Sequence, residues 1–379
     1  MGGITKRPDG KWRARWREYP GAKEQSKHFP RRIDAEDHLA QVRADLLRGS
    51  YIDPRAGQTT FRDFAEEWRQ IQTHRASTSH QVESYLRNHV YPVLGDKPLG
   101  GVRRTQIQAM VKGLSESLAP ATVEVVYRHT AAVFKAAAAD RLIASTPCVD
   151  IPLPKREPRV VLPLEVDAVQ ALAGAMPSHA SAMIALAAGT GMRQGECFGL
   201  TLDRVDLLRR TVTIDRQTDP EGSASLTPPK TLSSHRTVPL PDVVVLALAA
   251  HIKRHPVGDD GRIFRPARGT HWRRNRFREV LRRARADVGG LVAAGHLPLT
   301  ATVPESMTFH DLRHFYASLL IRHGESVKVV QARLGHASAS ETLDTYSHLW
   351  PDSEDTTRAA VDSVLGSVAD YSRTSEGQW

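Results

Sequence analysis

The chain has 379 residues, with 52 lysines and arginines against 42 aspartates and glutamates, a formal net charge of +10 and a pI near 9.8. This length predicts two or three domains, and the positive charge favours a polyanionic partner, with nucleic acid the first candidate. The two cysteines do not indicate a disulfide framework and favour a reducing cytoplasm. We expect no membrane partner, because no apolar stretch is long enough for a bilayer span or signal peptide and Lys6 breaks the myristoylation pattern.

Residues 1–58 are expected to form three strands and a helix. Pro8-Asp-Gly marks a turn, Glu24–Phe29 a further strand, and a helix capped by Asp34 is expected to run to Leu47. After the turn, aromatic and small residues alternate with cations, which predicts a strand with one packing face and one cationic face. Residues 1–32 hold ten cations against three acids, which favours DNA contact over a merely solvated face for Lys11, Arg13, Arg15 and Arg17.

The next segment, residues 59–149, has mostly helical patterns, broken at Pro92, Gly95 and Pro98. An unrelated helical bundle would show similar patterns. The helices are expected at 61–72, 79–90, 105–115 and 121–139.

Residues 150–161 are predicted to be an extended linker, because their three prolines exclude a helix and stiffen the chain. Its cations are expected to follow a phosphate backbone. They are Lys155, Arg156 and Arg159.

The second half, residues 162–379, contains short frames of charged residues. The first is Thr190-Gly-Met-Arg193-Gln-Gly-Glu196, and a hairpin carrying Lys230 is predicted after the β-branched run at 211–214. A strongly cationic helix is expected next, and phosphate contact is the natural use of its charge. Its arginines are Arg273, Arg274, Arg276, Arg278, Arg282, Arg283 and Arg285. Residues 288–306 are expected to form a long loop.

A further helix is expected to carry both an apolar stripe and a chemical stripe. His310 and Arg313 are three residues apart and so project from one side, with Thr308 as the expected N-cap and Gly324 as the stop. Tyr316 falls on the apolar stripe and is expected in the core. The stripe consists of Phe309, Leu312, Tyr316, Leu319 and Leu320.

The last frames are Leu334-Gly-His336 and Tyr346, the latter on a short helix expected to begin near Ser338 or Ser340. Apolar residues at helical spacing follow between Ser353 and Val368. This tail would complete the chain's own core.

In this order, the frames from Arg193 to Tyr346 resemble the tyrosine recombinases, and more closely the integrases of phages and integrative elements. The resemblance covers the catalytic half and includes an acidic residue at Glu196. It implies a multidomain chain, mainly α with small β elements. The implied parts are an arm-site DNA-binding module at 1–58, a helical core-binding (SAM-like) domain at 59–149, the linker at 150–161 and a mixed α/β catalytic domain at 162–379. The resemblance also implies an alternative for the C-terminal tail, which in the family can dock on a neighbouring subunit.

The residue types suit attack on a DNA phosphodiester, which gathers negative charge on the two non-bridging oxygens. Arg193 and Arg313 are assigned to these oxygens, because a guanidinium offers paired donors and stays protonated. His310 and His336 are assigned as further donors, with His310 also placed to take or orient the nucleophile's proton. Lys230 is the candidate acid for the leaving oxygen. Tyr346 is the proposed nucleophile, and its phosphotyrosine would keep the energy of the broken bond, so no ATP is needed.

Neither a cofactor nor a metal is expected. There is no Walker A sequence, and Gly189, Gly191 and Gly195 miss the dinucleotide pattern. His310 and His314 lack the neighbouring glutamate of a zinc helix, and Arg313 would repel a cation. Glu196 is expected to orient Arg193 through a salt bridge, whereas His314 and Arg236 could either support the site or lie on the surface.

Together with these features, the resemblance implies a site-specific recombinase that integrates or excises a phage or mobile element as a homotetramer on double-stranded DNA. Core and arm-type sites, with accessory bending and excision factors, are the expected partners, and the cytoplasm or nucleoid the expected location. The alternatives are a chromosome-dimer resolving recombinase, which generally lacks the basic N-terminal module, and a catalytically silent DNA-binding regulator. A type IB topoisomerase would share the chemistry without needing a specific site.

Overall fold

The computed structural model describes the chain in two units, residues 1–157 and 158–379, each held together by its own contacts. Each unit is described here by itself. The described residues are mainly helical and form three small sheets, which agrees with the fold class expected from the sequence. The described residues are 2–48, 51, 53, 55–157, 161–219, 223–229, 231–268, 271–350, 358–359 and 361–365.

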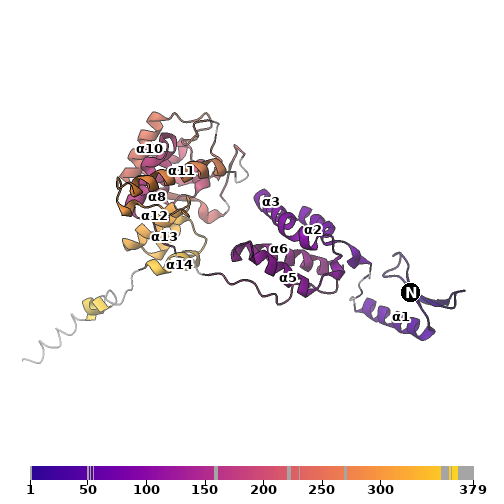
Figure 1. Cartoon of the computed structure of the whole chain (residues 1–379). Coiled ribbons are helices and arrows are strands. Elements are labelled where there is room, and N and C mark those ends of the chain that lie inside the picture. The colour runs from indigo at the N-terminus through magenta and orange to yellow at the C-terminus, as the bar shows by residue number, and fades with distance from the viewer. Residues whose placement is uncertain are drawn as a thin grey trace, which may run out of the picture. The chain divides into compact units, whose positions relative to one another are not determined.

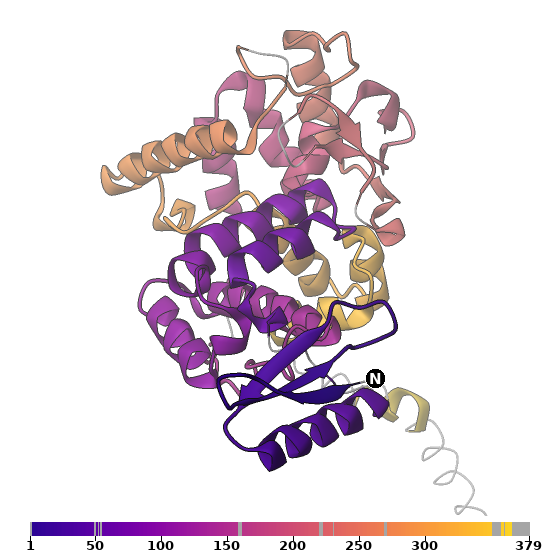
Figure 2. The ribbon, with the colours of Figure 1, turned by 90° about the vertical axis from the view of Figure 1, so that its right-hand side faces the viewer.

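The first unit begins with an antiparallel sheet in the order β1-β2-β3, and α1 packs against one face of it (Figure 2). Ala14 and Trp16 on β2 are buried against this helix, and the Trp16 indole donates to the Tyr51 hydroxyl at 2.7 Å. The alternation of packing and cationic residues therefore predicted this strand and its buried face correctly. The elements are β1 (Gly3–Lys6), β2 (Trp12–Trp16), β3 (Gln25–Phe29) and α1 (Arg32–Leu47).

The start of α1 differs from the prediction, because the helix begins at Arg32 and its N-cap is Arg31. Asp34 lies in the first turn, where its carboxylate accepts two hydrogen bonds from the Arg31 guanidinium. An acid in the first turn still suits the positive end of the helix dipole.

A helical core follows in the same unit (Figure 1). Pro92 does not break it as expected: α3 passes through a π-helical turn directly into α4, and Pro92 lies in the first turn of α4, where a missing N–H is tolerated. The elements are η1 (Ala56–Gln58), α2 (Phe61–Gln70), α3 (Ala76–Tyr85), the π turn η2 (Leu86–Val90), α4 (Tyr91–Leu94), η3 (Leu99–Gly101), α5 (Arg104–Ser115) and α6 (Pro120–Ala139).

The extended segment after this core is anchored at its beginning. The Arg104 guanidinium donates to the carbonyls of Val149 and Asp150, and Ile151 is buried in the helical core. Arg156 pairs with Glu124 on α6 at 2.6 Å, so this cation is held by the protein. Arg159 lies outside the described residues.

The second unit is built around α8, which packs against α7, α10 and α12 (Figure 1). Its alanine-rich sequence explains this central place, because small side chains let neighbouring helices approach closely. Beside it, β4-β5-β8 form one small sheet and β6-β7 another. The elements are α7 (Val166–Ala175), α8 (Ser178–Thr190), α9 (Gln194–Phe198), η4 (Leu202–Arg204), β4 (Val205–Asp206), β5 (Thr211–Ile214), β6 (Gln217–Thr218), β7 (Leu226–Thr227), η5 (Leu232–Ser234), β8 (Arg236–Pro239) and α10 (Asp242–Arg254).

The remaining helices close the unit. They are α11 (Arg274–Ala293), η6 (Leu299–Ala301), α12 (Asp311–Arg322), α13 (Val327–Leu334), α14 (Ala339–Tyr346) and η7 (Ser347–Leu349).

The loop expected at 288–306 is wrong in its first part, because α11 continues to Ala293 and buries Val288. The rest is bound to the protein: Thr300 donates to Asp167, and Arg285 donates to backbone carbonyls of Pro304, Glu305 and Met307. The expected long loop is therefore a helix extension followed by a tethered turn.

The end of the chain is described only in part. Residues 361–365 are helical, and Val361, Val364 and Leu365 are exposed. Most of the helix expected between Ser353 and Val368 lies outside the described residues.

Candidate active site

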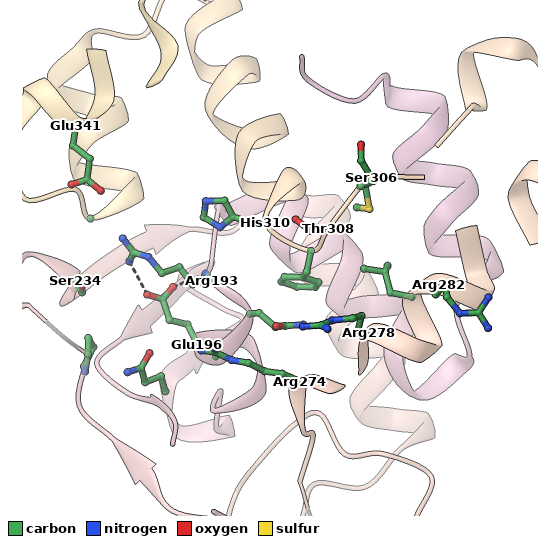
Figure 3. A pocket seen from close by; sticks show the side chains of 18 of the residues that line it. Arg193, Glu196, Ser234, Arg274, Arg278, Arg282, Ser306, Thr308, His310 and Glu341 are labelled. Carbon is green, nitrogen blue, oxygen red and sulfur yellow. Dashed lines mark hydrogen bonds and ion pairs between the residues drawn. The ribbon is translucent and has the colours of Figure 1, made fainter. Parts of the chain in front are cut away.

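An open cavity of about 740 Å³ lies in the second unit, between α9, α11 and the start of α12. Arg193 and His310 line it on one side (Figure 3). Arg274, Arg278 and Arg282 line another part of its wall from a single face of α11, since they are four residues apart (Figure 3). The cavity is therefore rich in cations and suited to an anionic chain.

Glu196 holds two arginines at the base of this cavity. Its carboxylate accepts from the Arg193 backbone N–H at 2.8 Å, closing the first turn of α9, and from the Arg193 guanidinium at 3.1 Å. It also receives two bonds from Arg236, at 2.8 and 3.1 Å. Burial alone would raise the pKa of Glu196, but the adjacent Arg236 and Arg193 outweigh burial and lower it. Glu196 is therefore an anion that orients cations.

Arg313 is 1% exposed and connects two of the sequence frames. Its guanidinium donates to the carbonyl of Gly191 at 2.9 Å and to that of Leu334 at 2.7 Å. Burial, with the charges of Arg193 and Arg236, lowers the pKa of Arg313 to about 9, so it is still positive at neutral pH.

The glycines of these frames are required by geometry. Gly191 and Gly335 each end a helix with a left-handed backbone, at φ +65° and +66°. A Cβ on Gly335 would lie 2.9 Å from the Ser233 carbonyl oxygen, and one on Gly191 would lie 2.6 Å from the Tyr316 ring. His336 directly follows the second of these turns, and Arg193 follows the first by two residues.

His310 faces the cavity at the start of α12 and is its N-cap residue. The expected N-cap, Thr308, lies two residues earlier and instead binds the Asp311 carboxylate through its backbone N–H and its hydroxyl. Although His310 is exposed toward the cavity, loss of hydration in this recess lowers its pKa to about 4, aided by His314, Arg313 and Arg193. His310 is therefore uncharged at neutral pH.

His336 is 8% exposed, and its Nδ1 lies 2.8 Å from the Thr342 hydroxyl. Its Nε2 lies 3.8 Å from the Glu341 carboxylate. Burial and Arg313 lower the pKa of His336, and Glu341 only partly opposes them. Thr342 thus fixes the orientation of the imidazole ring.

Tyr346 ends α14 and is 1% exposed. Its ring is nearly parallel to that of His336, at 6.5 Å between centroids and 11° between planes. Its hydroxyl lies 2.8 Å from Nδ1 of His314. Burial raises the pKa of Tyr346 to about 12, against the opposing charges of Arg313 and Arg193. The helix begins after Ser338, whose hydroxyl caps it.

The fold therefore gathers Arg193, His310, Arg313, His336 and Tyr346 in one region of the second unit. Arg193 and His310 face the cavity, whereas the other three are buried behind its wall. Lys230 lies outside the described residues.

The other cations selected from the sequence are dispersed. Arg273, the N-cap of α11, and Arg276 on that helix are exposed but do not line the cavity, unlike Arg274. Arg13 and Arg15 on β2 both lie within 3.7 Å of Glu24. Lys11, Arg17 and Lys155 are exposed.

Three supporting residues were missed or left undecided from the sequence. Arg236 is a buried partner of Glu196, and His314 contacts the Tyr346 hydroxyl. Thr342 could have been suspected, because it lies one helical turn before Tyr346. No local pattern distinguishes His314 from a surface histidine, since its role depends on the position of α14.

Two further findings concern metals and membranes. Within the described ranges, no three histidine, cysteine, aspartate or glutamate side chains are grouped as metal ligands would be. Among those same residues, no helix is both long and apolar enough to cross a bilayer.

Two family models match the chain: the phage integrase family over residues 163–352 and the phage integrase central domain over residues 61–152. An integrase of Mycobacterium phage D29 is 23% identical over 334 residues, covering 82% of this chain and 83% of the relative. A putative prophage phiRv2 integrase of Mycobacterium tuberculosis is 25% identical over 332 residues, covering 85% and 84%.

Solved structures share the fold. The Tn1549 transposon integrase in complex with a circular intermediate DNA matches with a TM-score of 0.65 and 21% identity, over 80% of this chain and 99% of that one. A lambda integrase tetramer bound to a Holliday junction matches with a TM-score of 0.59 and 18% identity, over 89% and 96%. Because the family model alone spans half of the sequence, the chain belongs to the phage integrase family and is a tyrosine-type site-specific recombinase.

Proposed function

We propose that this recombinase cuts and rejoins DNA through a 3′-phosphotyrosine formed by Tyr346, and that it integrates or excises a phage or mobile element. The observation that carries the proposal is the meeting of Arg193, Arg313, His336 and Tyr346 in one region, although they are spread over more than 150 positions of the sequence. A merely DNA-binding protein needs no buried tyrosine beside buried arginines.

In the proposed reaction, a phosphodiester enters the cavity and meets Arg193 and His310 first. Arg193 is already oriented by Glu196, so little reorganisation is needed when negative charge develops on the phosphate. Arg313 and His336, which are buried behind the cavity wall, would be the remaining hydrogen-bond donors to the phosphate. Lys230 would protonate the departing 5′ oxygen.

The cavity wall formed by α11 would hold the DNA backbone next to the cleaved bond. Arg274, Arg278 and Arg282 follow one another along the helix and face the same space as Arg193. A solved relative is a tetramer on a Holliday junction, which supports four-way junctions and tetramers as the assembly for this chain as well.

The test is a suicide substrate that carries the junction sequence of the encoding element, with a nick that lets the short cleaved strand diffuse away. The wild type should accumulate a covalent protein–DNA adduct, and Tyr346→Phe should form none. Tyr316→Phe is the matched control, because Tyr316 is also buried but lies on the apolar side of α12. Adduct in the Tyr346→Phe variant would refute the nucleophile, and no adduct in the wild type would favour a silent DNA-binding protein. Relaxation of a plasmid lacking the junction would indicate a topoisomerase.

A further inference from the structure

The hydroxyl of Tyr346 is paired with a residue outside the set expected from the sequence. Nδ1 of His314 lies 2.8 Å from this oxygen, and the two rings meet at 66° with centroids 5.6 Å apart. An imidazole nitrogen at this distance can accept the O–H when the ring carries its own proton on Nε2.

His314 also contacts a residue that lines the cavity. Its ring contacts that of His310 edge to face, with centroids 4.8 Å apart, and His310 lines the cavity. The position follows from α12, because His314 comes four residues after His310 and directly after Arg313. One helix therefore carries a group facing the phosphate, a buried cation and the partner of the nucleophile.

A proton acceptor is needed at this place. The phenol is buried, and burial raises the pKa of Tyr346 to about 12, so it carries its proton at neutral pH. The carboxylates of Glu341 and Asp311 act in the same direction, whereas Arg313 and Arg193 favour the phenolate. Attack with the proton still attached would leave a positive charge on the oxygen beside two arginines.

We propose that Nδ1 of His314 accepts the proton of Tyr346 during cleavage and returns it during religation. This inference rests on the proposed function. The O–H bond breaks and its proton goes to Nδ1, while an oxygen lone pair forms the bond to phosphorus. The bond from phosphorus to the 5′ oxygen breaks, and that oxygen leaves with its electron pair and takes a proton from the general acid. In religation the 5′ hydroxyl gives its proton back to the general acid as its oxygen forms the bond to phosphorus. The bond from phosphorus to the phenolic oxygen breaks, and His314 returns its proton to that oxygen.

This assignment separates two roles that the sequence suggested for His310. His310 faces the phosphate side of the site, and the hydroxyl of the nucleophile is paired with His314. Two histidines one helical turn apart would thus have different partners: His310 would contact the phosphate, and His314 would take the proton of the attacking oxygen.

The experiment compares His314→Asn with the wild type in single-turnover cleavage of the same suicide substrate. An asparagine amide oxygen can occupy nearly the place of Nδ1 and accept a hydrogen bond, but it cannot take a proton. Because general-base catalysis contributes roughly 100-fold or more, adduct formation should slow by at least about 100-fold while DNA affinity is unchanged. His323→Asn, the same change at an exposed position at the end of α12, should cleave like the wild type.

A second substrate distinguishes the base from the acid. With sulfur in place of the bridging 5′ oxygen, the leaving group needs no protonation. Lys230→Ala should therefore cleave this substrate at nearly the wild-type rate. His314→Asn should remain slow on this substrate, because the tyrosine must still lose its proton. The melting temperatures of all variants show whether folding is affected, and His314→Gln provides a second substitution of the same residue. If His314→Asn or His314→Gln is fully folded and slow, the proposal is supported.

Adduct formation by His314→Asn at the wild-type rate would overturn the proposal. Faster formation would also overturn it, since the histidine would then restrain the nucleophile. Either result leaves the proposed function intact as long as the wild type forms the adduct and Tyr346→Phe does not. A wild type without adduct would overturn the proposed function and this inference together.

Discussion

The residues around Glu196 show how a single buried carboxylate organises a cationic site. Two arginines converge on it, and Arg236 reaches it from β8, with only 5% of its side chain exposed. Buried ions need such partners, because the loss of hydration is not otherwise offset. Glu196 therefore stabilises the DNA-free site and keeps Arg193 oriented toward the cavity.

Replacing Arg236 by methionine should destabilise the second unit by about 3–5 kcal/mol, because part of the charge on Glu196 is left unpaired in the protein interior. The measurement is urea denaturation of the full chain, with hydrogen exchange in α12 reporting on this unit. Arg209→Met removes an exposed ion pair with Asp206 and should cost less than about 1 kcal/mol. Equal effects of the two changes would contradict this view of the site.

The buried His336 should make the stability of this unit depend on pH. Its pKa is lowered in the folded protein, while the unfolded chain titrates near 6.5, so below that pH the unfolded state binds more protons. The free energy of unfolding should be at its full value above pH about 6.5 and should fall as the pH drops toward 5.

Denaturation midpoints at pH 7.5 and pH 5 would measure this loss. His336→Asn should reduce the difference between the two midpoints, and the exposed His323→Asn should leave it unchanged. An undiminished difference in the His336 variant would assign the acid sensitivity to other groups.

At the scale of elements, α11 combines a packing face with a charged face. Phe277, Leu281, Ala284 and Val288 are buried, whereas Arg274, Arg278 and Arg282 line the cavity. Without DNA these arginines are a source of mutual repulsion, and Glu279 relieves part of it by pairing with Arg282 and Arg283. The helix is therefore suited to a polyanion.

Arg278→Gln should weaken DNA binding uniformly across sequences, and should reduce the slope of log K against log salt concentration by about 0.9, the value of one phosphate contact. Binding titrations at salt concentrations between about 50 and 200 mM would measure this slope. Arg283→Gln removes the same charge from an arginine of α11 that does not line the cavity and should change the slope much less. Identical slopes for wild type and Arg278→Gln would exclude this phosphate contact.

At the scale of the whole molecule, the two units carry separate cores, and the first unit contains the basic sheet as well as the helical domain. We expect the sheet to bind a second, arm-type DNA site. The reason is its cationic strand, in which Arg13 and Arg15 lie on the face opposite the buried Ala14 and Trp16.

Deleting residues 1–58 should abolish integration but leave cleavage of core-site DNA within a few-fold of the wild type. Plasmid integration assays and the suicide substrate measure the two activities separately. Arg13→Gln combined with Arg15→Gln should reproduce much of the integration defect with the module still folded. Full integration by the deleted chain would refute the arm-site role.

The amino-acid sequence by itself determined many of the element types, because they depend on local periodicity: the Trp12–Trp16 strand, α12 with its Gly324 stop and the short helix after Ser338 were all apparent. It also identified the charged frames, since arginine, histidine and glycine occur there at short spacings. The residues that cap or interrupt helices were predicted less well. Asp34 and Thr308 bind neighbouring side chains in place of capping a helix, and a π turn carries the helix past Pro92.

Only the tertiary structure decided which residues meet across elements. His314 contacts Tyr346, Thr342 orients His336, and Arg313 joins the Gly191 and Leu334 turns. A hydrogen bond between side chains 32 positions apart leaves no trace in local periodicity, because it depends on how α14 packs beside α12. For this reason the charged frames were readable in the chain, but the partner of the Tyr346 hydroxyl was not.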